Sequence, residues 1–183
     1  MNLRFYLEKL QSSKEFKKFA KENPNAYLCS GFFIVDKTNV KNPGNKINLD
    51  FYSPKDKKTF SFDVKEEIKL IPLEKYKNIP GRISPECEFN FEDMEKMILD
   101  EIDKKNIKTK IQKIIFSLQN LKGKDFLIGA IFISSFGLLK VDIDISGKKI
   151  TKFEKKSLLD MFRVTSKKKD KKETKASELW RLY

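Results

Sequence analysis

The chain repeats one pattern, in which a helical segment is followed by short segments that alternate between apolar and polar residues. The first copy leads into GFFIVD and KINLDFYSPKDKKTFSFDV, and the second leads into AIFISS and LLKVDIDISGKKITKFEKKS. Alternation with a period of two predicts strands, and an amphipathic helix buries its apolar stripe against the sheet that they form. The pattern predicts an α+β fold of two helix-plus-antiparallel-meander units, related by internal duplication, with sheets side by side or back to back.

In the first copy, the apolar spacing over residues 3–20 predicts helix. Ser12 and Glu15 have the spacing of a capping box, which predicts two short helices with a joint near Ser12. The run Asn23-Pro24-Asn25 ends the helical part. Strands are expected at residues 26–35, 46–52 and 58–64, with a turn at 53–57, a loop at 42–45 and a short strand at 68–71.

In the second copy, Asn90 is a good N-cap for a helix whose stripe is Met94, Ile98 and Ile102. A stronger apolar stripe at spacings of three and four predicts a further helix over residues 107–121, with Gly123 as its C-terminal stop. If one helix joined both stripes, acids would lie near its start and lysines near its end, as the helix dipole favours.

The chain then returns to strands at residues 126–134, 139–145 and 148–155, with a turn at Ser146-Gly147. Residues 157–164 fit one short amphipathic helix. We expect a first unit over residues 1–71, a connecting arm over 72–90 that is rich in proline, and a second unit over 91–164. Residues 165–183 are Lys-rich and predict a disordered basic tail.

The end of the second copy resembles the PepSY and cystatin-like folds. In those families a strand with a valine–aspartate pattern turns through a glycine into a last strand that bears lysine and isoleucine. The residues that match are Val141, Asp142, Asp144, Gly147, Lys148 and Ile150. The resemblance covers about residues 107–155, and more loosely 3–64, and it implies the fold alone. PepSY domains are typically secreted or membrane-attached and are thought to regulate peptidases, whereas this N-terminal segment has no export signal.

The net charge of +13 favours an anionic partner such as nucleic acid, a ribosome or a membrane surface. Two features weaken that interpretation. The basic residues are nearly all lysine, although arginine binds phosphate better because its guanidinium group can donate two hydrogen bonds at once. A chain rich in Lys, Asn, Ile and Phe is also what an AT-rich genome encodes, whatever the protein does. The acidic segment 86–103 also cancels the basic segment 104–124, so the surplus positive charge lies in residues 1–85 and 146–183.

The absence of histidine constrains the chemistry most strongly. It excludes a Ser-His-Asp triad, a Cys-His dyad and any histidine-ligated metal. Two cysteines are too few for a four-thiolate zinc site, and the glycines form no phosphate-binding loop. We therefore expect a chain with no catalytic residues, no cofactor and no metal ligands.

Asp142 and Asp144 lie two apart on a predicted strand and therefore point to one face. They could hold a hard cation, but we favour the solvated face of a hairpin, with Lys148, Lys152 and Glu154 across from them. Cys29 lies in an apolar predicted strand, and we expect it to be a small core residue. Cys87 lies in the arm beside two acids, which makes it a poor nucleophile.

The end of the chain is a candidate partner-binding motif. Its apolar residues are Leu179, Trp180, Leu182 and Tyr183, at the end of a basic stretch that contains Lys167, Lys168, Lys169, Lys171 and Lys172. Apolar residues at the end of a flexible linker resemble a docking motif for a groove or a strand edge. The alternative is that they fold back onto the domain, because an exposed tryptophan is costly.

These observations lead to three hypotheses. The first is a non-catalytic binding or scaffolding protein that engages a macromolecular partner, most readily a protein, through its tail. The second is a basic protein associated with nucleic acid or the ribosome, and the third is a small-molecule binder or enzyme with a pocket between helix and sheet. Because the chain lacks a long apolar run and has few cysteines, we expect no membrane span and a cytoplasmic location. The sequence leaves the oligomeric state open.

Overall fold

The structure, a computed structural model, describes residues 2–39, 41, 44–65, 67–72, 79–134 and 136–157. These described residues form three helices and eight strands. Their bounds are α1 Leu3–Ser12, α2 Lys14–Glu22, β1 Tyr27–Asp36, β2 Lys46–Ser53, β3 Lys58–Asp63, β4 Lys69–Pro72, α3 Phe91–Lys104, β5 Ile111–Leu121, β6 Lys124–Ile133, β7 Gly137–Asp144 and β8 Lys149–Ser157. The predicted α+β class is confirmed.

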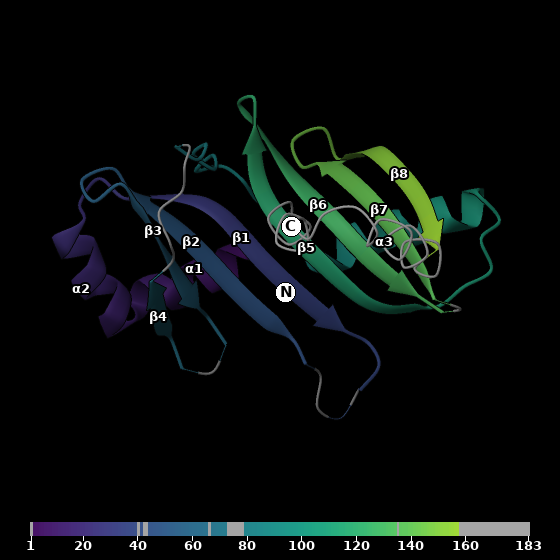
Figure 1. Cartoon of the computed structure of the whole chain (residues 1–183), viewed down its shortest axis with the longest axis horizontal. Coiled ribbons are helices and arrows are strands. Elements are labelled where there is room, and N and C mark those ends of the chain that lie inside the picture. The colour runs from purple at the N-terminus through teal and green to yellow at the C-terminus, as the bar shows by residue number, and fades with distance from the viewer. Residues whose placement is uncertain are drawn as a thin grey trace, which may run out of the picture.

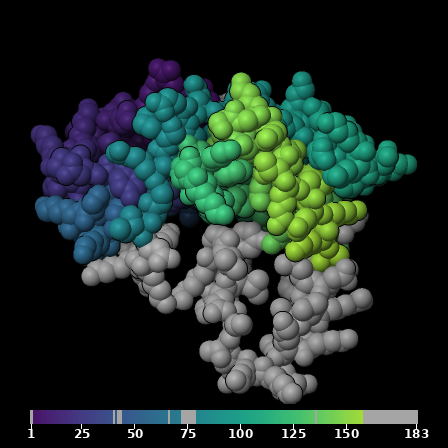
Figure 2. Space-filling view, turned by 90° about the horizontal axis from the view of Figure 1, so that it is seen from above, coloured from purple at the N-terminus to yellow at the C-terminus, as the bar shows by residue number. Residues whose placement is uncertain are grey.

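The eight strands form one antiparallel sheet in the order β4-β3-β2-β1-β5-β6-β7-β8. Each half of the chain therefore contributes a four-strand meander, and the two meanders join through their first strands. β1 and β5 pair antiparallel, with Phe33 opposite Phe116. Figure 1 shows the two meanders in one twisted sheet, and Figure 2 shows the first and second halves at opposite ends of the long axis.

All three helices cover the same face of this sheet (Figure 1). Their buried residues, such as Leu10, Phe19 and Ile98, belong to one hydrophobic cluster with strand residues from both meanders. The strand residues in that cluster alternate along each strand, as a sheet with one covered face requires. Phe33 and Phe116 are each 1% exposed and connect the two halves at the centre of the sheet.

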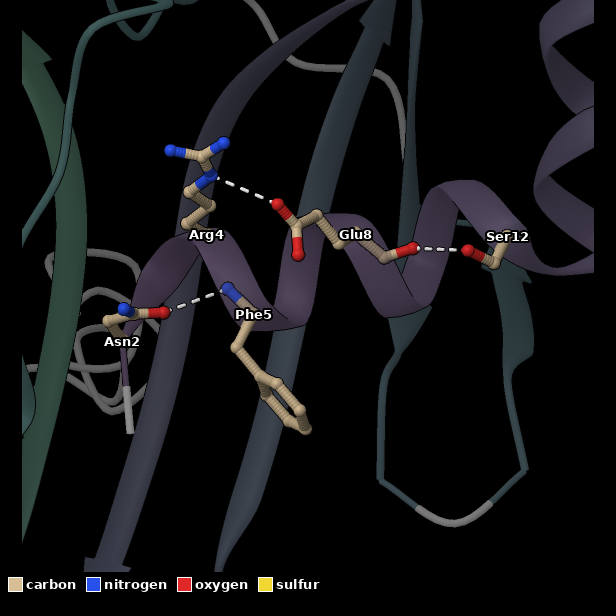
Figure 3. A network of polar contacts seen from close by, with 5 residues as sticks. All are labelled: Asn2, Arg4, Phe5, Glu8 and Ser12. Atoms are coloured by element: carbon tan, nitrogen blue, oxygen red, sulfur yellow. Dashed lines mark hydrogen bonds and ion pairs between the residues drawn. The ribbon is translucent and has the colours of Figure 1, made fainter.

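The first helical segment divides as predicted, but the capping residue differs by one position. Ser13, and not Ser12, caps α2, because its Oγ accepts from the backbone N of Phe16 at 3.1 Å. Ser12 instead closes α1 by donating to the carbonyl of Glu8 at 2.8 Å (Figure 3). The capping box predicted between Ser12 and Glu15 is therefore wrong, while the joint is confirmed.

The start of α1 is capped by Asn2, whose Oδ1 accepts from the backbone N of Phe5 at 2.9 Å (Figure 3). Arg4 and Glu8 form an ion pair one turn apart, at 2.9 Å between Nε and Oε1. Both side chains are exposed, so this pair contributes little to stability. The predicted cap of α3 is confirmed, since Asn90 Oδ1 accepts from the backbone N of Glu92 at 3.1 Å.

The helix predicted over residues 107–121 is wrong, because this segment forms β5. Ile114, Phe116 and Leu118 alternate onto the helix-covered face and are 1% exposed or less. Ile115 lies on the opposite face, and a register shift between Ile111 and Lys113 returns Ile111 to the covered face. The resulting apolar spacing imitates that of a helix. The β-branched isoleucines suit a strand that is paired on both sides. Gly123, at φ 81°, belongs to the β5–β6 turn and not to a helix end.

The helix α3 therefore ends at Lys104, and Asn106 follows with φ 53°. The lysines beyond it lie in the connection to β5, on β5, in the β5–β6 turn and at the start of β6. A single helix spanning the acidic and basic segments is thus wrong. The remaining predicted strands are confirmed within a few residues, including the short strand at β4 and the β7–β8 hairpin.

The described part of the arm, residues 79–90, passes between the diverging ends of β1 and β5. Its backbone N at Ile83 donates to the carbonyl of Leu28, and its backbone N at Ser84 donates to Asp125 Oδ2 at 3.0 Å. Ile83 and Phe89 then enter the hydrophobic cluster. The sheet and the cluster thus continue across this arm, and the division of the chain into units at residues 72–90 stays a prediction.

No helix in the described ranges is both long enough and apolar enough to cross a membrane. The helix predicted over residues 157–164 and the tail predicted over 165–183 lie outside the described residues, apart from Ser157, which ends β8.

Candidate functional site

The partner-binding residues predicted at the end of the chain lie outside the described residues. They are Leu179, Trp180, Leu182 and Tyr183, with the basic residues Lys167, Lys168, Lys169, Lys171 and Lys172. The site that the structure does describe lies on the sheet, on the face opposite the three helices. We call this the outer face.

The carboxylates of Asp142 and Asp144 have different surroundings although they share the outer face. Asp144 Oδ1 accepts from the backbone N of Gly147 and from Ser146 Oγ, each at 2.9 Å. These two hydrogen bonds lower the pKa of Asp144 and tie it to the β7–β8 turn. Asp142 lies opposite Lys152 in the register. Within the described residues, acids and cysteines form no group of three that could hold a metal ion.

Both thiols are free and buried enough to resist ionisation. Burial, with the Asp50 charge nearby, raises the pKa of Cys29 to about 12. Burial, with a contribution from Asp125, raises the pKa of Cys87 to about 12 as well. Cys87 is a poor nucleophile as expected, although its own burial and Asp125 cause this, and not the two acids beside it in the sequence.

The outer face carries a band of half-buried apolar side chains along its central strands. Alternation places them opposite the core residues of the same strands. The band consists of Phe32 and Ile34 on β1, Ile115 on β5, and Phe126, Ile128 and Phe132 on β6. No helix in the described ranges covers these residues, and each of them is half-buried.

An open groove of about 640 Å³ lies at one end of this band, beside the β5–β6 turn. We call it the outer groove. Its lining residues are Asn120, Leu121, Lys122, Lys124, Phe126, Ile128 and Asp142. Leu121, Phe126 and Ile128 supply apolar side chains, and Leu121 is 44% exposed. The groove therefore offers apolar contact to an incoming side chain without a rearrangement of the sheet.

The charges around the outer groove are mainly positive. Lys122 and Lys124 flank it at the turn, and both are exposed. Asp142 is the one acid among the lining residues, and it faces Lys152 across the β7–β8 pairing. The groove thus combines apolar walls with a lysine rim, which suits an apolar side chain that has a carboxylate or phosphate near it.

The other half of the outer face carries polar side chains instead. Five of them form a row across β1, β2 and β3, which we call the polar row: Ser30, Asn48, Asp50, Thr59 and Ser61. Ser30 Oγ donates to Asp50 Oδ2 at 2.6 Å, and Asn48 Nδ2 donates to Ser61 Oγ at 3.3 Å. Burial raises the pKa of Asp50, and hydrogen bonds from Ser30 and Ser61 offset only part of that shift.

Sequence reasoning missed both features of the outer face. The apolar run over residues 126–134 did indicate that β6 is apolar on both faces, which is the signal for Phe126 and Ile128. The alternation over residues 46–52 shows only that Asn48 and Asp50 face away from Leu49 and Phe51. Asn48 is only 7% exposed and Thr59 is fully buried, and nothing in the alternation itself distinguishes a buried polar face from a solvated one.

Comparisons with known proteins give one likeness in fold. No protein family model and no curated protein matches the chain. The chain is similar in structure to a putative lipoprotein from Clostridium difficile 630, with a TM-score of 0.50 and 12% sequence identity. The likeness covers 78% of this chain and 90% of that protein. At this identity, the likeness shows a shared fold alone.

Proposed function

We propose that this protein is a non-catalytic binding protein that holds a protein partner in the outer groove. The observation that carries this proposal is the open groove itself, with apolar walls and a lysine rim on the sheet face opposite the helices. Partner segments that fit are those with an exposed leucine- or phenylalanine-like side chain beside one or more acids. Such a segment would bury its apolar group against Leu121, Phe126 and Ile128 and place its acids near Lys122 and Lys124.

The apolar part of the contact supplies most of the expected affinity. Leu121 is exposed, and Phe126 and Ile128 are half-buried, so each of them still has apolar surface to lose to a partner. Burial of apolar surface stabilises a complex by about 25 cal/mol per Å² before the costs of association. The lysines contribute more to the association rate and to the choice of partner than to affinity.

The basic tail enters this proposal as a second contact. Its apolar residues Leu179, Trp180, Leu182 and Tyr183 would bind the same partner elsewhere, so that two weak contacts act together. Loss of either contact then weakens the complex, and the two variants should be distinguishable because they alter different parts of the chain.

The test starts from affinity capture of the full chain from its native lysate, with and without nuclease, followed by purification of the protein that it retains. The affinity for that purified partner is then measured for the full chain, for a double variant Lys122→Glu with Lys124→Glu, and for a chain that ends at Val164. We expect the groove variant to lose at least about tenfold in affinity, because two favourable charge contacts become repulsive.

A matched control comes from α2, where Lys14→Glu with Lys17→Glu makes the same change in net charge on the opposite face of the molecule. Both lysines are exposed, and acids suit the first turn of a helix. Equal loss in the control and the groove variant would reject the outer groove and leave only a general charge effect. Capture that nuclease abolishes would reject a protein partner in favour of nucleic acid.

We also propose that the chain arose by duplication of a unit made of helix and meander, as in PepSY and cystatin-like folds. Two features support this proposal. The strand order runs outward from β1 in one meander and outward from β5 in the other. Because β1 and β5 pair antiparallel, an approximate two-fold axis through the sheet relates the two meanders. Expression of residues 1–72 or 79–157 alone as a folded homodimer that pairs through β1 or β5 would support it, and failure of both pieces to fold would count against it.

The cytoplasmic location is likewise our proposal. Cys29 and Cys87 are both free, which suits a reducing compartment. The name of the structural neighbour, a lipoprotein, gives the competing expectation. Cell fractionation decides between them, because recovery of the native protein in the membrane fraction with an attached acyl chain would reject the cytoplasmic location.

A further inference from the structure

The strand β8 forms an open edge of the sheet that is long enough to accept another strand. It is the last strand in the sheet order, and among the described strands only β7 pairs with it (Figure 1). A strand directs its backbone N–H and C=O groups to its two sides by turns, so about half of those groups on β8 point away from the sheet. These groups can pair with an extended segment of another protein.

The two edges of the sheet differ in how they discourage unwanted pairing. The opposite edge, β4, has only four residues and ends at Pro72, which has no N–H to donate. The strand β8 has nine residues and no proline. Its protection is charge, because residues 148–157 include five lysines and one glutamate. Pairing of β8 with the β8 of a second copy would bring like charges together, so the lysines disfavour it.

The register with β7 determines which side chains of β8 lie on the outer face. Lys152 lies opposite Asp142, and Lys156 follows four residues later on the same side of the strand, so both lysines belong to the outer face. Both are exposed. Glu154 lies between them, with carboxylate oxygens 3.4 Å from Lys152 Nζ and 3.6 Å from Lys156 Nζ. One acid thus serves two lysines, which leaves the outer face of this edge positively charged.

The helix-covered face of β8 carries apolar side chains instead. Phe153 lies opposite Val141, and Ile150 lies opposite Ile143. Both Phe153 and Ile150 are half-buried and pack against the hydrophobic cluster. Lys155 shares this face and is exposed. A strand added at this edge would place side chains of its own beside Phe153 and Ile150, because neighbouring strands lie about 4.8 Å apart.

We propose that β8 binds an extended segment of another protein in which acidic and apolar residues alternate, added to the sheet as a ninth strand. The acids of that segment lie on the outer face against Lys152 and Lys156, and its apolar residues pack beside Ile150 and Phe153. Backbone hydrogen bonds supply affinity, and the alternation of charge and apolar surface selects the partner. This edge is separate from the outer groove, which lies on β5, β6 and β7 and in the β5–β6 turn.

The test is binding of a synthetic peptide of nine residues that alternates glutamate and valine, with blocked ends, to the full chain at low salt. Fluorescence anisotropy measures the affinity. We expect Lys152→Glu with Lys156→Glu to weaken binding by at least about tenfold, because favourable charge contacts become repulsive. The same variant should instead prefer a peptide that alternates lysine and valine, which also shows that the variant folds. The control on α2, Lys14→Glu with Lys17→Glu, should keep the parental affinity.

Two further measurements separate strand addition from simple attraction between charges. A peptide with the same glutamates and valines in two blocks has the same charge but cannot place its acids on one face, so it should bind at least about tenfold more weakly. Amide hydrogen exchange of β8 should slow by at least about tenfold when the alternating peptide binds. Equal binding of both peptides, exchange that slows in the β5–β6 turn and not in β8, or no binding at low salt would overturn the proposal.

Discussion

The two meanders share one architecture but divide polar and apolar residues differently. In the first, the core is aromatic: the rings of Phe16, Phe19 and Phe51 pack around Phe62 at centroid distances of 5.2–5.8 Å. In the second, the core side chains of β6 and β7 are aliphatic, such as Leu127, Ile131 and Leu139, and Phe116 lies on β5 beside the first meander. The same strand order thus holds an aromatic core under α2 and a mainly aliphatic one in the second meander.

The outer faces of the two meanders also differ, and the first meander has the more polar one. By strand register, the polar row of the first meander corresponds to apolar positions in the second, such as Ala130, Phe132 and Leu138. Position by position, Asp50 of β2 has its counterpart in Phe132 of β6, because their partners Ser30 and Lys113 lie three residues before Phe33 and Phe116. One architecture therefore carries the polar row in one half and the outer groove in the other.

The largest expected effect is the loss of stability when a core side chain is removed, and it should differ between the two meanders. Phe62→Ala should cost about 3–5 kcal/mol in the free energy of unfolding, because it removes a ring that is 0% exposed and touches three other rings. Leu139→Ala, its counterpart in the second core, should cost about 2–5 kcal/mol and on average less. Urea unfolding of both variants measures the difference, and a greater loss for Leu139→Ala would contradict the aromatic packing described for the first core.

A smaller effect should appear in the dependence of stability on pH. The pKa of Asp144 is lowered by hydrogen bonds from Gly147 and Ser146 at the β7–β8 turn. A lowered pKa stabilises the folded state above the pKa of the unfolded chain, about 3.9, and this contribution is lost as the pH falls through the folded pKa. Asp144→Ala should therefore be less stable than the parent chain at neutral pH, with the difference shrinking in acid.

Unfolding curves collected from neutral to acidic pH test this prediction. A difference that grows as the pH falls would show that Asp144 acts in some other way.

The smallest effects concern the turns, and the two halves should respond with opposite signs. The β5–β6 turn has Lys122 at φ 54° and Gly123 at φ 81°, and a Cβ at Gly123 would meet no atom within 4 Å. Gly123→Ala should therefore cost about 1 kcal/mol through backbone strain alone. In the β2–β3 turn, Lys57 already has φ 53°, and Lys57→Gly should stabilise by a few tenths of a kcal/mol to about 1 kcal/mol. The same sign for both substitutions in chemical unfolding would contradict this account of the turns.

Much of the fold follows from local patterns, and the exceptions have a common cause. Clean alternation identified β2, β3 and β7, and the Met94–Ile98–Ile102 stripe identified α3. β5 was mistaken for a helix because it lies in the middle of the sheet, where both of its faces are apolar. A strand of that kind loses the period of two on which the prediction depends.

The site was harder to predict because it depends on pairing between distant segments. The polar row forms only when β1, β2 and β3 align in one register, which brings Ser30, Asp50 and Ser61 together. The outer groove requires β5, β6 and β7 to share a face that the helices leave open. Neither arrangement is encoded within a single segment, so the sequence predicted the residues of the strands and not the surfaces that they build.

The most direct test of the outer groove is site-specific photo-crosslinking in living cells. A photoreactive residue at Leu121 lies in the groove, and one at Leu99 lies on α3; the two native side chains are 44% and 42% exposed, so their access to solvent is matched. We predict that the Leu121 position crosslinks to one protein partner and that the Leu99 position does not. Crosslinking of that partner from Leu99 and not from Leu121 would place the contact on the helical face and contradict the account.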